Sequence, residues 1–253
     1  MSPIPLRSRL AGVPLDHVTL GGAVDRVIAL ARAGAGGTVY TPNVDHVVVA
    51  SEHETFRRAY DDVSLSLVDG MPVFWATRLL GFPVPEKVSG SDLFEPLVER
   101  AAAENLSIYL LGGGPGVAEL ASAQLLAKFP SLRIVGSSSP RLDGEGEITD
   151  REIELERVRA SSADLVFVAC GAPKSELFCF KNAATLAPAV LVCVGAAIDF
   201  TAGTARRAPR WMSRVGVEWA YRLAREPRRF AHRYLVRDPK FLVLLAREWR
   251  QRR

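Results

Sequence analysis

Six short apolar runs recur along the chain, and helix-like stretches lie between them. The runs are continuous rather than alternating in polarity, which is typical of strands in a sheet that is covered on both faces. They begin at Gly37, Leu65, Ser107, Arg133, Asp164 and Val190. The sequence therefore predicts an α/β protein with a Rossmann-like, mostly parallel sheet and helices on both faces.

Five helices are expected between these runs. One begins at Thr149, where Glu152 three residues later fits a capping box. The last apolar run is expected to continue as a strand to Phe200, so that Asp199 ends it. The five helices are predicted near residues 45–60, 72–80, 117–129, 149–161 and 174–186.

Charge divides the chain into two parts. Residues 206–253 hold 15 Lys and Arg against 4 Asp and Glu, a net charge of +11, whereas residues 1–205 carry −7. A segment this basic is attracted to phosphates of nucleic acid, lipid or a diphosphate substrate. We expect a Rossmann-like catalytic domain over residues 1–204 and a basic helical appendage over 205–253 that binds substrate and an anionic membrane surface.

Composition places the protein among ordinary globular chains. Its 253 residues are 48% hydrophobic, enough for one large core. The three cysteines lie in or beside apolar runs, as free buried thiols would in a reducing compartment. Prolines and arginines break the first twelve residues, which lack the pattern of a secretion signal, and the longest apolar run is too short to span a bilayer. These features indicate a cytoplasmic protein.

Two predicted strands end in polar motifs. Thr41 and Asn43 follow the first strand in TPNVDH, and Asp69 follows the second in LVDGMP. Ligand sites of open α/β sheets lie at the carboxyl ends of strands. Asp69 is our candidate catalytic base, since burial could raise its pKa enough for it to take a proton from a hydroxyl. The alternative for Asp69 and for Asn43 is to cap the helix that follows.

Three further turns carry candidate substrate-binding residues. Gly112, Gly113 and Gly114 precede a helix whose amino end could hold a phosphate, although a tight turn explains them equally well. Glu176 lies in the first turn of a helix, where interaction with the helix dipole is the alternative role. Asp199 could bind a ribose or a base edge, or cap a turn.

Arginines of the basic segment are the candidate phosphate ligands. We rank Arg222 and Arg229 first and Arg207 and Arg233 next, and a solvated basic face is the alternative for each. The chain contains no Asp-x-Asp motif, a pattern that could hold a metal beside a diphosphate. We therefore expect no metal and no cofactor.

Taken in order, these motifs resemble those of the WecG/TagA/CpsF family of bacterial glycosyltransferases. The resemblance spans roughly residues 41–234 and includes TPNVDH, VDGMP, VSGSDL, LLGGGPG, GAPKSE, VGAAIDFTAG, RRAP and EWAYRLAREPRRF. It implies inverting transfer of an N-acetylmannosamine-type or related hexose from a UDP-sugar to an undecaprenyl-diphosphate-linked acceptor, in cell-wall or exopolysaccharide synthesis. It also implies that Asp69 is the general base and that Thr41 and Asn43 contact substrate.

The resemblance further implies a basic appendage that approaches the inner face of the cell membrane. Three positions depart from the family pattern: Ser175 stands where a Gln is usual, Phe178 stands where a Trp is usual, and His232 precedes Arg233 where an arginine pair is expected. Ser175 cannot make the two-ended contacts of an amide. These departures bear on donor preference.

Two other classes of function would also use features of this sequence. A nucleotide-sugar-binding or regulatory protein would keep the crevice without turnover. A nucleic-acid-binding module could use the same basic segment, but the sequence has neither a recognition motif nor a series of stacking aromatics, so we expect no nucleic-acid partner. The sequence is compatible with a homo-oligomer.

Overall fold

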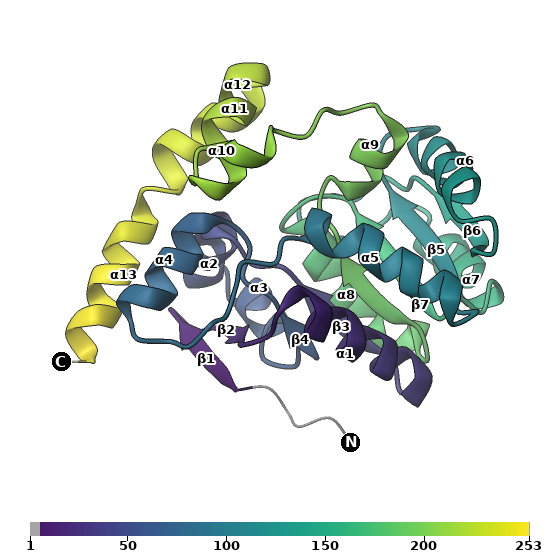
Figure 1. The fold of residues 1–253 in the computed structure, drawn as a ribbon, viewed down its shortest axis with the longest axis horizontal. Coiled ribbons are helices and arrows are strands. Elements are labelled where there is room, and N and C mark those ends of the chain that lie inside the picture. Colours follow the sequence, from purple (N-terminus) through teal and green to yellow (C-terminus); the bar gives the residue numbers. More distant parts are fainter. Residues whose placement is uncertain (1–5, 253) are drawn as a thin grey trace.

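The computed structural model describes residues 6–252, apart from the side chains of Arg210 and Arg214. Its centre is a six-stranded sheet in the order β4-β3-β8-β7-β5-β6, in which every pair is parallel. The strands are β3 (Gly37–Tyr40), β4 (Leu65–Ser66), β5 (Ser107–Gly112), β6 (Arg133–Ser138), β7 (Leu165–Ala169) and β8 (Val190–Cys193). The predicted Rossmann-like parallel sheet is confirmed (Figure 1).

Helices cover both faces of the sheet and form two separate cores. Side chains of α1 (Leu20–Ala33), α5 (Gly90–Ala103), α6 (Val117–Lys128) and α9 (Ala197–Ala202) pack on one face. Those of α2 (Val44–Glu52), α3 (Glu54–Ala59), α4 (Met71–Leu79), α7 (Arg151–Ala160) and α8 (Lys174–Leu186) pack on the other. An antiparallel hairpin of β1 (Arg7–Leu10) and β2 (Val13–Asp16) lies outside the sheet.

The neighbouring strands β3 and β8 send their following helices to opposite faces. The α2 helix after β3 belongs to one core, and α9 after β8 belongs to the other. Such a divergence opens a crevice outside the carboxyl ends of the strands, which is where parallel α/β proteins bind ligands.

Three sequence-based boundaries were wrong. The helix predicted over 45–60 is two helices, because the His53 side chain accepts from the Phe56 amide and starts α3. The helix predicted from Thr149 begins at Arg151 after Asp150 and has no side-chain cap. The last strand ends at Cys193, because Gly195 turns the chain with φ +57° and the following residues form α9. Asp199 therefore lies in a helix.

The basic segment is helical, as predicted. It forms α10 (Arg210–Arg214), α11 (Glu218–Arg225), α12 (Pro227–His232), the π-helix η1 (Arg233–Arg237) and α13 (Lys240–Gln251). Figure 1 shows this segment leaving α9, crossing above the sheet and descending beside α2 and α4. Across residues 6–252, no helix is long and apolar enough to cross a membrane.

The cysteines carry free thiols, as the sequence predicts. Cys179 and Cys193 are buried, and their sulfur atoms lie 3.6 Å apart. Cys170 is half-buried, and burial raises the pKa of its thiol to about 12. It is therefore protonated at neutral pH, which makes it a weak nucleophile.

Candidate active site

Two polar strand ends lie next to each other, as their motifs predict. The Asp69 amide donates to the Pro42 carbonyl oxygen at 3.0 Å, which joins the turn after β4 to the turn after β3. Asn43 is the N-cap of α2, and its side-chain oxygen accepts from the amides of Asp45 and His46 at 3.0 and 3.4 Å. The predicted capping role of Asn43 therefore exists, and it fixes the direction of the side chain.

Asp69 does not cap the helix after it. Gly70 is the N-cap of α4, with φ +80°, and no side chain bonds to the helix end. The half-buried Asp69 carboxylate accepts no hydrogen bond from any residue in the described part of the chain. Burial raises its pKa, as do the nearby carboxylates of Glu218 and Asp92, and the charges of Lys87 and Arg222 only partly oppose this. A carboxylate in this state is available to take a proton.

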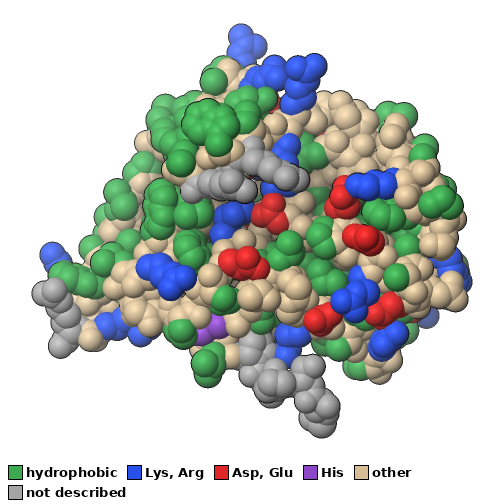
Figure 2. Space-filling view, in the orientation of Figure 1, with side chains coloured by type: hydrophobic (Ala, Val, Ile, Leu, Met, Phe, Trp, Pro, Cys, Tyr) green, Lys and Arg blue, Asp and Glu red, His purple; other side chains and the backbone are tan. Residues whose placement is uncertain are grey.

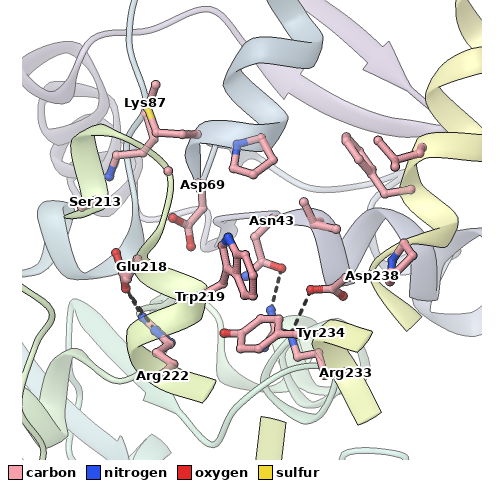
Figure 3. A pocket seen from close by; sticks show the side chains of 18 residues that line it. Asn43, Asp69, Lys87, Ser213, Glu218, Trp219, Arg222, Arg233, Tyr234 and Asp238 are labelled. Carbon is pink, nitrogen blue, oxygen red and sulfur yellow. Dashed lines mark hydrogen bonds and ion pairs between the residues drawn. The ribbon is translucent and has the colours of Figure 1, made fainter. Parts of the chain in front are cut away.

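Asp69 lines a cavity of about 410 Å³ at the carboxyl edge of the sheet, a size that suits a small ligand. Figure 3 shows its carboxylate pointing toward Glu218 and Trp219. The core supplies Asn43, Lys87 and the first residues of α4, and the basic segment supplies the opposite wall. The polar and aromatic lining residues are Asn43, Asp69, Lys87, Ser213, Glu218, Trp219, Arg222, Arg233, Tyr234, Asp238 and Phe241.

The basic segment contributes two arginines that are held in place by carboxylates. On α11, Arg222 pairs with Glu218 one turn earlier, with Nη2 and Nε at 2.5 and 3.0 Å from Oε1. Arg233 donates from Nη2 to the Asn43 side-chain oxygen at 3.1 Å, and its Nε lies 3.4 Å from Asp45. Both guanidinium groups therefore face the cavity with orientations fixed by protein contacts.

Asp45 attaches η1 to the core. It is buried at the start of α2, and Arg237 pairs with it at 3.0 Å beside Arg233. Asp238, which lines the cavity, lies 3.8 Å from Arg233. Burial raises the pKa of Asp238 to about 6, and the charge of Asp45 adds to this shift.

A second cavity, of about 630 Å³, lies beside the first. Arg222 lines both cavities. In the second cavity Gly114 and Asp199 come from the core, and Arg229 comes from α12. Burial raises the pKa of Asp199, against the effect of the Arg229 charge. Arg206 and Arg225 also line this cavity, so its lining holds more arginines than carboxylates, which are those of Asp199 and Glu226.

The three glycines before α6 differ in surroundings. A Cβ on Gly112 would lie 2.6 Å from the Ala169 backbone, and one on Gly113 would lie 2.9 Å from the Val117 side chain. Both also have positive φ, at +122° and +75°. Close packing and turn geometry therefore account for these two positions. Only Gly114 of the three lines the second cavity.

Three further predicted site residues lie outside the two cavities, as Gly112 and Gly113 do. Thr41 is buried directly after β3, two residues before the lining residue Asn43. Glu176 is buried in the first turn of α8 and pairs with His46 at 3.3 Å, behind Asn43. Arg207 pairs with Asp92 at the start of α5. The contacts of Glu176 and Arg207 support the structure, and contact of these three residues with substrate stays a prediction.

Sequence reasoning missed Lys87, Glu218 and Asp238 as lining residues. Lys87 donates to Asp92 at 2.5 Å, and Asp92 also closes the capping box of α5 with Ser89. Lys87 directly precedes the VSGSDL motif, so its position before a capped helix could have indicated it as a site residue. Glu218 and Asp238 had no such signal, because their neighbours in the cavity are distant in sequence.

The sheet, the crevice and the residues gathered there place the chain in the class of parallel α/β proteins with a ligand site at the carboxyl edge of the sheet. The chain belongs to the glycosyl transferase WecG/TagA/CpsF family, whose model matches residues 8–253. A relative from Bacillus spizizenii is 27% identical over 215 residues, which are 85% of this chain and 80% of that protein. It is named N-acetylglucosaminyldiphosphoundecaprenol N-acetyl-beta-D-mannosaminyltransferase. The resemblance seen in the sequence motifs is thus confirmed.

Proposed function

We propose that this protein is an inverting glycosyltransferase. It would transfer an N-acetylmannosamine-type or related hexose from a UDP-sugar to a sugar linked to undecaprenyl diphosphate, in cell-wall or exopolysaccharide synthesis. The observation that carries the proposal is the Asp69 carboxylate, which lies without a hydrogen-bond donor among the described residues, has a raised pKa and shares a cavity with two oriented arginines. The name of the Bacillus relative supports the choice of donor sugar and acceptor.

In this reaction Asp69 removes the proton from an acceptor hydroxyl. The resulting oxygen attacks the anomeric carbon of the donor from the face opposite to UDP, and the bond from that carbon to the diphosphate breaks. A single displacement of this kind inverts the anomeric configuration. Asn43 is suited to hold a sugar hydroxyl beside Asp69, because its side-chain oxygen is fixed by the α2 amides and Arg233 while its amide nitrogen can donate.

The second cavity suits the nucleotide. Its cationic lining, with Asp199 at one side, could hold a diphosphate and a ribose or base edge. Arg222 lies where the two cavities meet and would neutralise the charge that grows on the leaving diphosphate. Arg229 and the amino end of α6 at Gly114 would add to this effect.

The basic segment serves as the proposed membrane-facing appendage. Residues 205–253 carry the cavity arginines and also exposed apolar side chains, among them Trp211, Leu235 and Leu242. Exposed apolar and basic side chains together are what attachment to an anionic membrane surface requires. The protein would then act as a peripheral protein on the cytoplasmic face of the cell membrane, where a lipid-linked acceptor is accessible.

A screen of UDP-sugars against lipid-diphosphate acceptors tests the function. The expected product is the acceptor plus one hexose by mass, formed with release of one UDP. The configuration of the new bond, read by NMR, should be opposite to that of the donor. Binding of UDP-sugar without transfer to any acceptor in the panel would instead support a nucleotide-sugar-binding protein.

A further inference from the structure

The cavity around Asp69 changes character along its length. In Figure 3, Lys87 and Asp69 lie at one side, and Asn43, Arg233 and Asp238 lie nearer to α13. The part next to α13 is largely apolar. Its lining side chains include Val44, Pro72, Pro239, Phe241 and Leu242. A water-soluble nucleotide sugar has no hydrocarbon to fill such a space.

Two helices form the walls of this apolar end. Met71 begins α4 and Phe241 lies in the first turn of α13, and both line the cavity. Beyond the far ends of both helices, the Arg252 guanidinium lies 4.5 Å from the centre of the Phe82 ring. Both helices therefore start at the cavity and run away from it in the same direction (Figure 1).

Apolar side chains continue from the cavity to the surface. Leu242 lines the cavity and yet is 67% exposed, so it lies at the mouth. On α4, Trp75 and Leu79 follow Met71 at intervals of four residues, on one face of the helix. They are 50% and 58% exposed. Figure 2 shows hydrophobic side chains gathered on this side of the molecule, over α4 and α13.

We propose that the apolar end of this cavity, between Pro72 of α4 and Leu242 of α13, binds the isoprene units nearest the diphosphate of the acceptor lipid. Trp75 and Leu79 then continue the track toward the bilayer. The site has the polarity of such a ligand, because Arg222 and Arg233 in the same cavity match the diphosphate and the apolar end matches the hydrocarbon. This assignment rests on the proposed function for its choice of lipid.

Binding to the intact protein tests the assignment without any turnover. Calorimetry compares inorganic diphosphate, geranyl diphosphate and farnesyl diphosphate at concentrations below micelle formation. Each isoprene unit that becomes partly buried should tighten binding by roughly tenfold. The expected order is farnesyl tighter than geranyl by about tenfold, and geranyl tighter than inorganic diphosphate by about 100-fold, for about three buried units in farnesyl and about two in geranyl.

Leu242→Gln and Val243→Gln form a matched pair. Both side chains are exposed and adjacent on α13, but Val243 does not line the cavity. Leu242→Gln should lower the affinity for farnesyl diphosphate by about tenfold and leave the affinity for inorganic diphosphate unchanged. Val243→Gln should change neither affinity. Both substitutions are neutral, so they alter no charge near the diphosphate.

Affinity that does not increase with chain length, or an equal loss of the gain in both variants, would overturn the assignment. Melting temperatures of the two variants check that each is folded, and Val44→Thr, which removes apolar surface from the lining, repeats the test if Leu242→Gln is unstable. The result of this binding test does not depend on whether the protein transfers a sugar. A protein that transfers no sugar could still show the chain-length gain, and an active enzyme could lack it.

Discussion

The side-chain oxygen of Asn43 lies 3.1 Å from Nη2 of Arg233, although 190 positions separate the two residues in the chain. Through this contact the basic C-terminal segment meets the turn after the first strand of the sheet. The cavity is complete only when the segment is docked in this way, because the two parts supply opposite walls.

Variants of Arg233 and Arg237 distinguish a role in catalysis from a role in docking the basic segment onto the core. Both pair with Asp45, but only Arg233 lines the cavity. Arg233→Ala should lower kcat/KM by ~10–100-fold, because it removes a charge-assisted contact to substrate as well as one to the core. Arg237→Ala should lower the melting temperature with a smaller effect on kcat/KM. Equal kinetic losses in the two variants would mean that Arg233 acts only through docking.

Asp238 should make stability depend on pH. Its pKa is raised to about 6 in the folded protein, so between about pH 4 and pH 6 the folded state binds more protons there than the unfolded state. The free energy of unfolding should therefore fall as pH rises through this window. Chemical denaturation at pH 4.5 and 7 should show a smaller fall for Asp238→Asn than for the wild type.

The exposed Asp62 provides a control for this measurement. Asp62→Asn should keep the pH dependence of the wild type. Wild-type pH dependence in Asp238→Asn as well would show that Asp238 does not titrate in this window. The other groups that face Asp238, namely Asp45, His46, Arg233 and Arg237, are intact in both variants.

Much of the site could be predicted because parallel strands end at one edge of the sheet. Asp69 and Asn43 follow strands that are hydrogen-bonded neighbours, so continuous apolar runs with polar ends were enough to bring them together. The change in composition after Gly203 likewise marked the basic segment and its arginines.

Other parts of the site could not be predicted, because they depend on how distant segments pack. Nothing near Glu218 or Asp238 indicates that each faces the turn after a strand. Asp199 was misplaced because AAIDF is apolar enough for a buried strand, whereas the backbone turns at Gly195 and forms a helix. Arg207 and Glu176 carry charges that suit a substrate, yet Asp92 and His46 already pair with them.

Transfer should not require a divalent metal. The chain has no Asp-x-Asp motif, and arginines line both cavities where a diphosphate would bind. EDTA should therefore leave the rate of UDP release within about twofold, and added Mg²⁺ or Mn²⁺ should change it little. A loss of activity on chelation that metal reverses would show that a cation shares the neutralisation of the leaving group.

A chain that ends at Thr204 tests the predicted division into two domains. It should fold, because both cores of the sheet lie almost entirely within residues 1–204. It should lose transfer to a lipid-linked acceptor and binding to vesicles that contain anionic lipid. Aggregation of the truncated chain, together with failure of the intact protein to bind such vesicles, would contradict the membrane role of residues 205–253.

The most direct measurement of the central claim is product formation by the wild type and by Asp69→Asn. Each is incubated with a UDP-hexose and an N-acetylglucosaminyl-diphosphate lipid, and the product is followed by mass. We expect one hexose to be added by the wild type and turnover to fall by ~10²-fold or more in the variant. UDP affinity should be retained, and the melting temperature should not fall, because the raised pKa means that the Asp69 charge destabilises the folded state. Turnover equal to wild type in a folded Asp69→Asn variant would contradict the assignment of Asp69 as the base.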